Sequence, residues 1–299
     1  MKFEKTNIDD EGEKIKQLIK LANNGDIQSH FLVGCYYADR KDYGMAEKYW
    51  KFHADKGLSE FQCNLGLLYH TQGKIELAIE YYSKAAGKRV AVAQNNLGTI
   101  YSENYQLNFA IKYWIMAANN GVSNAQYNLG YYYFKEREYL SAKKYFELAV
   151  SNSNMLSLKY LGKIALLEKN DNLAEKYLKL SANDSEAESC HLLGAFYADR
   201  KKFQLAEQYF KMSIELEFIR SYYPLYRIYT MKDRVEEAEF ILKLGADKGC
   251  SECQFHFAMH CIKVKKFELT YKYMVRAAKQ GNDDAKDFFE FIKDKSLMN

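Results

Sequence analysis

Apolar and polar positions recur along this chain with a fixed period of 32 residues. The pattern is clearest from Ala125 to Ala149, where Gly130 serves as an anchor for the register. Glycines at the equivalent position are Gly34, Gly66, Gly98, Gly130, Gly162 and Gly194. Tyr226 and Ala258 continue the register without a glycine. An uninterrupted period of this length predicts a solenoid, here of eight repeats.

Each repeat predicts two amphipathic helices. Leu129 and Tyr133 lie four residues apart on one face of a first helix, and Ala142 and Phe146 lie four apart on a second. The charged segment 135–138 between them is a turn with no room for a strand. The pattern therefore predicts a hairpin of two helices in every repeat.

The anchor glycine predicts a close approach between the two helices of a hairpin. A glycine inside a helix costs about 1 kcal/mol relative to alanine, yet this one recurs six times. A small residue stands at a partner position of the second helix: Ala46, Ala78, Ala110, Ala142, Ala174, Ala206 and Ala238. Large residues occupy the neighbouring layer: Trp50, Tyr82, Trp114, Phe146 and Phe210.

The hairpin resembles the tetratricopeptide repeat. The motif is Leu65-Gly66, then Tyr69, Ala78 and Tyr82, with the glycine-to-alanine spacing of that family. Two family marks are missing. The early tryptophan position holds Gln62, Gln94, Gln126 and Gln254, and the inter-repeat proline position holds residues such as Leu58, Val90 and Val122.

The junction between repeats resembles the Sel-one-like (Sel1) repeat instead. The residues that match its junction are Ala117, Ala118, Gly121, Ala125, Gln126, Asn128, Leu129 and Gly130. Sel1-like repeats usually have a longer loop between their helices, which this chain lacks. Together the resemblances span roughly residues 11–292. They imply an all-α fold, a right-handed superhelical α-solenoid of eight 32-residue helix-turn-helix repeats.

The register also predicts how the chain is divided. We expect an N-terminal capping helix within residues 1–26, its helical part over 11–24, and the solenoid over 27–282. A final helix over 283–293 and a polar, frayed tail complete the C-terminal cap, 283–299. The fifth repeat departs from the pattern at Ala165 and Asp171, through either a hinge or sequence drift.

Composition and charge narrow the functional classes. Half of the 26 tyrosines occupy two repeat positions, where the ring packs and the hydroxyl stays hydrated. The net charge of +4 is small for 299 residues and gives no reason to expect nucleic acid or an anionic membrane as partner. No apolar run approaches the length of a membrane span, and no secretory signal is visible. We expect six reduced cysteines and a cytoplasmic location inside a cell, or inside a host cell if the chain is viral or an effector.

One cluster has the residue types of a metal site: Cys250, Cys253, His256, His260 and Cys261. Three of them project within a narrow arc of one helix. However, each also occupies a slot that alanine, asparagine or an aliphatic residue fills in other repeats, and paired cysteine ligands normally come from a knuckle. We interpret the cluster as structural and expect no metal and no cofactor.

No constellation supports catalysis. The six histidines are scattered among the repeats, and there is no Gly-rich phosphate loop, Gly-x-Ser-x-Gly or His-Glu-x-x-His motif. The recurring glycines are single residues inside helices and cannot cradle a phosphate. We therefore expect a protein that is not an enzyme.

The resemblance to tetratricopeptide arrays implies that a concave face, lined by first helices, binds a partner. The positions that carry over to this face give the candidate partner-binding residues Asn95, Thr99, Tyr127, Tyr131, Lys159, Lys163, His191, Arg220, Tyr223 and Arg227. The face changes from polar and aromatic to basic along the chain, so an acidic or aromatic peptide would suit it. Lysines on a helix face are also ordinary solvated residues.

The function that we favour from the sequence is a non-enzymatic interaction scaffold or adaptor that binds a peptide segment or a protein on its concave face. The alternative is an accessory or regulatory subunit that docks an enzyme through its convex face or its ends. A contiguous exposed apolar patch in the groove favours the first, and one on an end or ridge favours the second.

Overall fold

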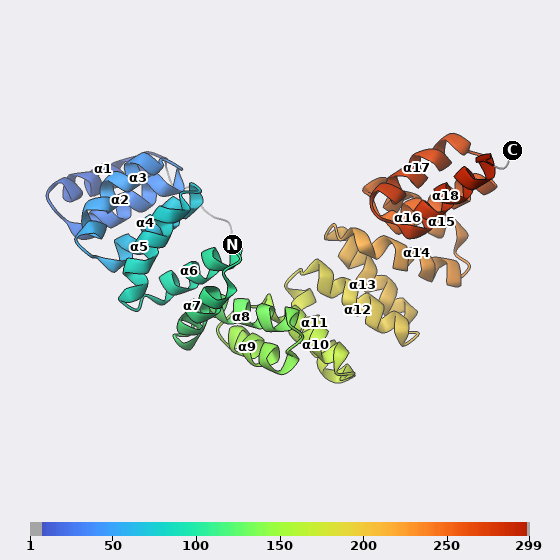
Figure 1. Cartoon of the computed structure of the whole chain (residues 1–299), viewed down its shortest axis with the longest axis horizontal. Helices are drawn as coiled ribbons and strands as arrows, with labels where there is room; N and C mark the ends of the chain where they lie inside the picture. The colour runs from blue at the N-terminus through green and yellow to red at the C-terminus, as the bar shows by residue number, and fades with distance from the viewer. Residues whose placement is uncertain (1–7, 298–299) are drawn as a thin grey trace. The chain divides into compact units, whose positions relative to one another are not determined.

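The computed structural model describes residues 8–297, which form 18 α-helices and one short 3-10 helix and contain no strand. The chain divides into two compact units, Met1–Ser157 and Leu158–Asn299. Successive helices pair along the chain in both units (Figure 1). The expected all-α repeat solenoid is confirmed.

In the N-terminal unit, four hairpins follow a single leading helix. The helices are α1 (Ile8–Asn23), α2 (Ile27–Asp39), α3 (Tyr43–Asp55), α4 (Ser59–Thr71), α5 (Ile75–Gly87), α6 (Ala91–Glu103), α7 (Leu107–Asn119), α8 (Ser123–Lys135) and α9 (Tyr139–Ser151). Each even-numbered helix packs against the next to form a hairpin, and α1 packs against α2. Helix α1 begins three residues before the expected start.

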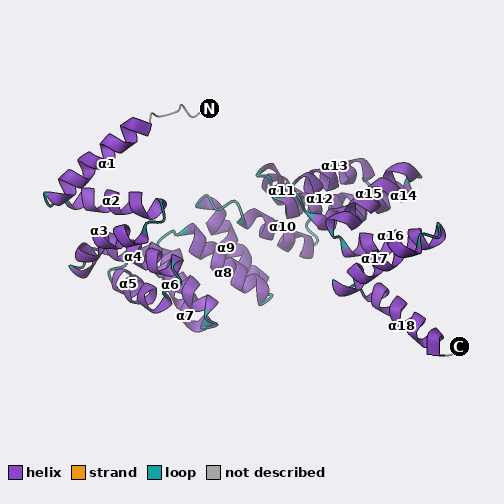
Figure 2. Ribbon diagram, turned by 90° about the horizontal axis from the view of Figure 1, so that it is seen from above, coloured by secondary structure: helices purple, strands orange, loops and turns teal. Residues whose placement is uncertain are grey.

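The C-terminal unit continues the alternation. Its helices are α10 (Ser157–Leu167), α11 (Asp171–Asn183), α12 (Ala187–Asp199), α13 (Phe203–Glu215), η1 (Ile219–Ser221), α14 (Tyr222–Met231), α15 (Val235–Lys248), α16 (Ser251–Lys263), α17 (Phe267–Lys279) and α18 (Asp283–Leu297). Figure 2 shows that short loops join them. Helix α18 packs against α17 and runs four residues beyond its expected end, into the segment for which we predicted fraying. Residues 298 and 299 of that tail lie outside the described residues.

Left-handed backbone at fixed register positions ends the helices. All eight turns inside the hairpins have a residue of positive φ, from Lys41 (60°) to Lys265 (57°). The junctions between repeats have one as well, and there it is often glycine, as in Gly121 at 78° and Gly249 at 99°. Glycine takes this conformation without the steric cost that a Cβ brings. This is why glycines recur at the junctions.

The anchor glycine makes room for one large side chain of the second helix. A Cβ built on Gly194 would lie 2.6 Å from a ring atom of Phe210, and one on Gly130 would lie 2.7 Å from Phe146. Gly34 faces the indole of Trp50 in the same way. The predicted close approach is therefore between glycine and the aromatic layer, sixteen residues further along the sequence.

Buried glutamines take over the early tryptophan position of the tetratricopeptide repeat. Gln126 Nε2 donates to the carbonyl oxygen of Ala118 at 3.1 Å, and Gln254 donates to Ala246 at the same distance. Each bond joins a first helix to the end of the preceding second helix. A buried carbonyl oxygen at a helix end lowers stability when no donor reaches it. The glutamine supplies that donor and so links adjacent repeats.

The tyrosines of the two recurrent positions pair within hairpins. Tyr101 stacks on Tyr113 with ring centroids 5.6 Å apart, and Tyr133 stacks on Tyr145 at 5.6 Å. Where such a tyrosine is buried, its hydroxyl reaches a carboxylate of the neighbouring helix rather than water, as Tyr69 does with Glu47 at 2.9 Å. The expectation of hydrated hydroxyls is therefore wrong for Tyr69.

Two irregular residues have local explanations. Pro224 is the third residue of α14, so its missing N–H falls in the first turn, as expected. Asp171, at a position that is apolar in other repeats, begins α11 and accepts a hydrogen bond from Arg200 Nε at 2.8 Å. The ion pair links α11 to the end of α12 and compensates for the polar residue.

Candidate functional site

The first helices α4, α6 and α8 of the N-terminal unit lie next to one another. We call the surface that they share the first-helix face. Four predicted residues stand on it, Asn95 and Thr99 on α6 and Tyr127 and Tyr131 on α8. The two tyrosine rings are stacked, with centroids 6.4 Å apart. The structure thus brings these four predicted residues onto neighbouring helices.

A pocket of about 340 Å³ opens on this face between α6, α7 and α8, and we call it the α6–α8 pocket. Thr99 and Tyr131 line it, whereas Asn95 and Tyr127 do not. Its apolar wall includes Leu107 and Trp114, which come from the second helix α7. The sequence had assigned Trp114 only to the packing layer, so its place in the wall was missed.

Polar side chains within and below the pocket are joined to one another. Thr99 Oγ1 donates to the carbonyl oxygen of Asn95 at 3.2 Å, and Asn128 Nδ2 donates to Asn95 Oδ1 at 3.4 Å. Asn95 is buried, with 8% of its surface exposed. It therefore acts as a support that orients Thr99 and Asn128 from below.

In the C-terminal unit, the predicted lysines of α10 are engaged by glutamates. Lys159 Nζ lies 2.8 Å from Glu186 and 3.0 Å from Glu188, and Lys163 Nζ lies 2.6 Å from Glu188. Burial raises the pKa of the Glu188 carboxyl, but the hydrogen bonds from Lys163 and Lys159 outweigh it and the net pKa is lowered. The positive charge expected here is therefore compensated inside the protein.

Sequence reasoning missed Glu186 and Glu188, although a signal was present. Glu186 occupies the junction position that Leu58, Val90 and Val122 hold in other repeats. Glu186 is thus an acidic residue at a position that is apolar in other repeats, and Lys159 and Lys163 lie in the repeat before it. This combination indicates an ion pair between adjacent repeats. The pair anchors the start of α12, where Glu186 also accepts from Ser189 N–H at 2.6 Å.

The other predicted residues of this unit are partly engaged. His191 Nδ1 lies 2.9 Å from Ser221 Oγ, and burial lowers the pKa of its imidazole. The Tyr223 hydroxyl lies 2.8 Å from His256 Nε2, and the two rings stack with centroids 4.8 Å apart. Arg220 and Arg227 are exposed. Of the four cations singled out from the sequence, the two arginines are the ones that lie exposed.

The cysteine and histidine cluster is spread over different surroundings. Cys250 Sγ caps the start of α16, 3.4 Å from Cys253 N–H, while His256 stacks on Tyr223. His260 Nε2 lies 3.8 Å from Glu239. Among the described residues, no three His, Cys, Asp or Glu side chains are arranged to hold a metal ion.

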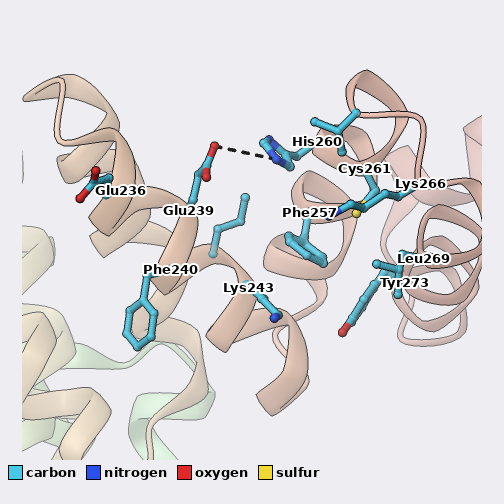
Figure 3. Close-up of a pocket in the computed structure, with 12 residues that line it drawn as sticks. Glu236, Glu239, Phe240, Lys243, Phe257, His260, Cys261, Lys266, Leu269 and Tyr273 are labelled. Atoms are coloured by element: carbon cyan, nitrogen blue, oxygen red, sulfur yellow. Dashed lines mark ion pairs between the residues drawn. The ribbon is translucent and has the colours of Figure 1, made fainter.

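A second pocket, of about 480 Å³, opens between α15, α16 and α17, and we call it the α15–α17 pocket. Figure 3 shows Glu239 of α15 and His260 of α16 facing each other at its edge, with Phe257 between the helices. Phe240 also belongs to its lining and is 68% exposed. This pocket combines apolar walls with charges of both signs.

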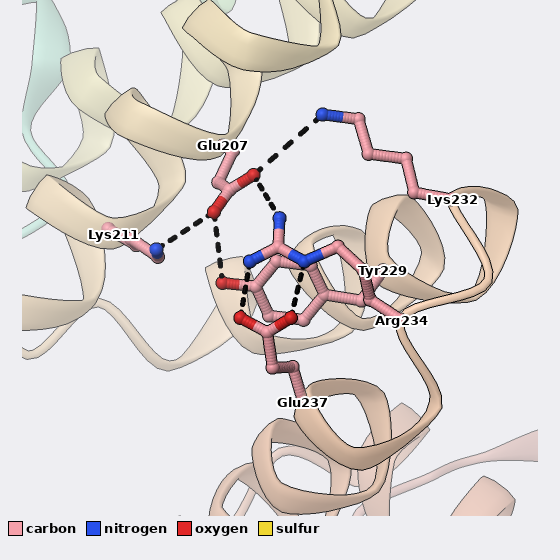
Figure 4. Close-up of polar contacts among 6 residues, drawn as sticks. All are labelled: Glu207, Lys211, Tyr229, Lys232, Arg234 and Glu237. Carbon is pink, nitrogen blue, oxygen red and sulfur yellow. Dashed lines mark hydrogen bonds and ion pairs between the residues drawn. The ribbon is translucent and has the colours of Figure 1, made fainter.

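A charged cluster on α13 and the turn before α15 lies close by in the sequence. Lys211 Nζ lies 2.8 Å from Glu207 Oε1, and Arg234 Nη1 lies 2.7 Å from Glu207 Oε2 (Figure 4). The guanidinium carbon of Arg234 also lies 4.3 Å from the centroid of the Tyr229 ring. Burial raises the pKa of Glu207, but the hydrogen bonds from Lys211 and Arg234 lower it overall. Because its charges are mutually satisfied, the cluster fastens two repeats rather than offering a binding site.

Residues 59–87 and 123–154 match the family model of the tetratricopeptide repeat. No curated protein matches the sequence. In the part of the chain that the structure describes, no helix is both long and apolar enough to cross a membrane.

Several solved structures share the fold. One is c5321, a protective antigen of uropathogenic Escherichia coli with a Sel1-like repeat fold, at a TM-score of 0.77 and 22% identity over 94% of this chain and 67% of that one. Another is a Sel1 repeat protein from Oxalobacter formigenes, at a TM-score of 0.69 and 17% identity over 93% of this chain and 90% of that one. Yeast Tom70 is similar at a TM-score of 0.55 and 14% identity, covering 86% of this chain and 60% of that one.

Proposed function

Since this chain is a solenoid of tetratricopeptide and Sel1-like repeats, we propose that it is a non-catalytic adaptor that binds a peptide segment of a partner protein on its first-helix face. Solenoids of this kind generally bind proteins along the extended surface that their repeats create. The proposal places the partner, like the chain, inside a cell and involves neither nucleic acid nor a membrane surface.

The observation that carries the proposal is the α6–α8 pocket. Thr99 and Tyr131 line it, and both belong to the register position for which the family resemblance implies partner contact. Tyr131 is 40% exposed and Leu107 is 44% exposed, so the wall offers apolar surface that a peptide side chain can cover. Aromatic residues of this type dominate the binding energy of many interfaces.

The surroundings of two histidines support the non-catalytic part of the proposal, whereas His70 and His260 lie beside Glu103 and Glu239. His191 bonds to Ser221, and His256 bonds to Tyr223. Neither pair is joined in the described residues to a carboxylate that would orient a base, as nucleophilic catalysis requires. These repeats are in general interaction modules, and the site has the composition of a recognition surface.

Photo-crosslinking tests the proposal directly. Benzoylphenylalanine is placed at Tyr131, and in a second protein at Phe240 in the α15–α17 pocket. Both are irradiated in extracts of cells that express the chain. We expect one partner protein to crosslink through position 131, and its recovery to fall several-fold when Leu107→Ala is added to the same protein, because Leu107 lines the same pocket.

Tyr105→Asn is the matched control. Tyr105 is 93% exposed and lies outside the pocket, in a turn of positive φ that asparagine tolerates. Recovery of the partner should be unchanged in this variant. A partner that crosslinks through position 240 and not through position 131 would contradict binding on the first-helix face.

The α15–α17 pocket favours a second candidate function. Phe240 is 68% exposed, Phe267 67% and Tyr271 68%, and all three lie on second helices. Of these, Phe240 lines the pocket, and an exposed aromatic side chain at a pocket is typical of a docking surface. In this alternative the chain is an accessory subunit that holds an enzyme through its second helices, and crosslinking through position 240 is the outcome that supports it.

A further inference from the structure

Four exposed side chains form a stripe along helix α15, and we call them the α15 stripe: Glu236, Glu239, Phe240 and Lys243. They recur at i, i+3, i+4 and i+7, so they stand on one side of the helix. All four line the α15–α17 pocket, and Phe240 is 68% exposed. The stripe thus has an exposed aromatic ring near its centre, acidic residues before it and a lysine after it.

Phe240 stands between two hollows of the surface. On one side is the α15–α17 pocket, of about 480 Å³. On the other is a hollow of about 280 Å³ between α13, α14 and α15, and Phe240 lines this one as well. A side chain with a hollow on either side is a ridge beside a groove, the shape that packed helices present to each other. The same surface therefore offers both a ridge and a groove that can receive one.

The charges at the two ends of the stripe are not engaged within the chain. In the part of the chain that the structure describes, neither Glu236 nor Lys243 forms an ion pair. Glu239 is different, because its carboxylate lies 3.8 Å from His260 Nε2. Figure 3 shows Glu239 directed toward His260, whereas the Phe240 ring points the other way. The ends of the stripe are therefore the charges that can meet a partner.

The order of these charges fits a second copy of the same stripe that runs in the opposite direction. Glu236 lies four residues before Phe240, and Lys243 lies three residues after it. When two copies of α15 pack antiparallel and cross at positions 239 and 240, Glu236 of each copy faces Lys243 of the other. A surface that complements itself in this way is what a twofold-symmetric dimer requires.

We propose that the protein forms a symmetric dimer through the α15 stripe, with Phe240 of each copy in the α15–α17 pocket of the other and two reciprocal ion pairs between Glu236 and Lys243. This inference goes beyond the proposed function, which concerns the first-helix face, and does not depend on it. It competes with the second candidate function, because it assigns the exposed ring of Phe240 to another copy of this chain instead of an enzyme.

Sedimentation equilibrium of the full chain between about 1 µM and 300 µM tests the proposal, since this range covers weak association. We expect a monomer–dimer equilibrium. Phe240→Ala should raise its dissociation constant at least about tenfold, because an aromatic anchor at the centre of an interface is lost. Phe52→Ala is the matched control. Phe52 is also exposed, at 58%, but it lies on α3, so this variant should leave the equilibrium unchanged.

Charge reversal tests the direction in which the two helices run. Glu236→Lys and Lys243→Glu should each weaken association several-fold, because like charges then face each other at both ends. An equimolar mixture of the two variants should form a heterodimer, because each lysine of the one then faces a glutamate of the other. Both reversals in one chain should restore the wild-type dissociation constant. Urea unfolding of each variant checks that the fold persists.

A chain that stays monomeric over the whole range overturns the inference. A dimer that Phe240→Ala does not weaken, or a mixture of the two reversals that stays monomeric, overturns it as well, because association then uses another surface or another direction. Crosslinking through position 240 should give a product of two copies of the chain. A product with a different protein, from a chain that is monomeric in solution, overturns the dimer and supports the accessory subunit. Crosslinking through position 131 tests the proposed function separately from all of these results.

Discussion

Replacing Gly194 by alanine tests the packing rule on which the repeats are built. Alanine is the better helix former, by about 1 kcal/mol, so propensity alone predicts a more stable protein. The structure predicts the opposite. A Cβ at this position would lie 2.6, 2.7 and 2.8 Å from three ring atoms of Phe210, which is only 1% exposed.

The size of the effect follows from that geometry. The ring of Phe210 must retreat by about 0.8 Å to restore an ordinary contact of 3.4 Å, in a core that has little room to give. Overpacking of this kind costs about 1–3 kcal/mol. We place Gly194→Ala near the upper end because the ring is rigid and enclosed. After the gain in helix propensity, the net loss should be about 1–2 kcal/mol.

The assay compares thermal and urea unfolding of two glycine-to-alanine variants. Gly87 ends α5, is exposed, and has nothing within 4 Å of the position of a Cβ. Gly87→Ala should therefore leave stability unchanged or raise it. Gly194→Ala should lower the melting temperature by roughly 2–4 °C for each kcal/mol lost.

A double variant isolates the contact. The eighth repeat already pairs an alanine with a methionine at these positions, Ala258 and Met274, and both are fully buried. Adding Phe210→Met to Gly194→Ala copies that pair. The double variant should lose less than the sum of the single losses, with a coupling of at least about 0.5 kcal/mol. An alanine variant as stable as the wild type, or additive losses, would refute the packing account.

Three further outcomes are expected. Purified protein should contain no stoichiometric zinc, and elemental analysis that finds one equivalent, lost with His256→Ala, would reverse our interpretation of the cysteine and histidine cluster. The lysine partners of Glu188 hold its pKa in the folded protein below its pKa in the unfolded chain. The ion pairs therefore stabilise the fold fully above the unfolded-state pKa, and this stabilisation is lost as the pH falls through the folded-state pKa. Lys159→Met should thus cost about 1–2 kcal/mol near pH 7 and progressively less toward about pH 3, measured by urea unfolding. Gln126→Leu should cost about 1 kcal/mol more than Gln94→Leu, measured by urea unfolding. The Gln94 hydrogen bond is longer, 3.4 Å, and its Oε1 has no partner in the part of the chain that the structure describes.

Much of the fold could be predicted because repetition makes each position visible several times. The helices of the hairpins follow from the spacing of Leu129, Tyr133, Ala142 and Phe146, since an amphipathic helix must bury one face. Gly57 and Gly121 recur at the same register position of the junctions in the sequence, and both have positive φ in the structure. The helix ends were harder. Helix α18 runs on to Leu297, where polarity had suggested fraying.

The candidate site could be predicted only in part. Register places Thr99 and Tyr131 on adjacent first helices, and both side chains line the α6–α8 pocket. Register could not reveal the orientation of Trp114, because that depends on how an indole fits against Gly98 and its surroundings. Nor could it show that Lys159 is neutralised, because its partners lie a repeat away along the sequence.

The sequence by itself determined the period, the hairpins and the order of the repeats, because each helix carries its own amphipathic pattern and each turn its own left-handed residue. Only the tertiary structure decided which polar and charged side chains have hydrogen-bond or ion-pair partners. Lys159 forms ion pairs with Glu186 and Glu188, whereas the indole N–H of Trp114 has no acceptor among the described residues. Hydrogen bonds and ion pairs depend on distances of a few tenths of an ångström between side chains of different helices, and a one-dimensional pattern does not encode those distances.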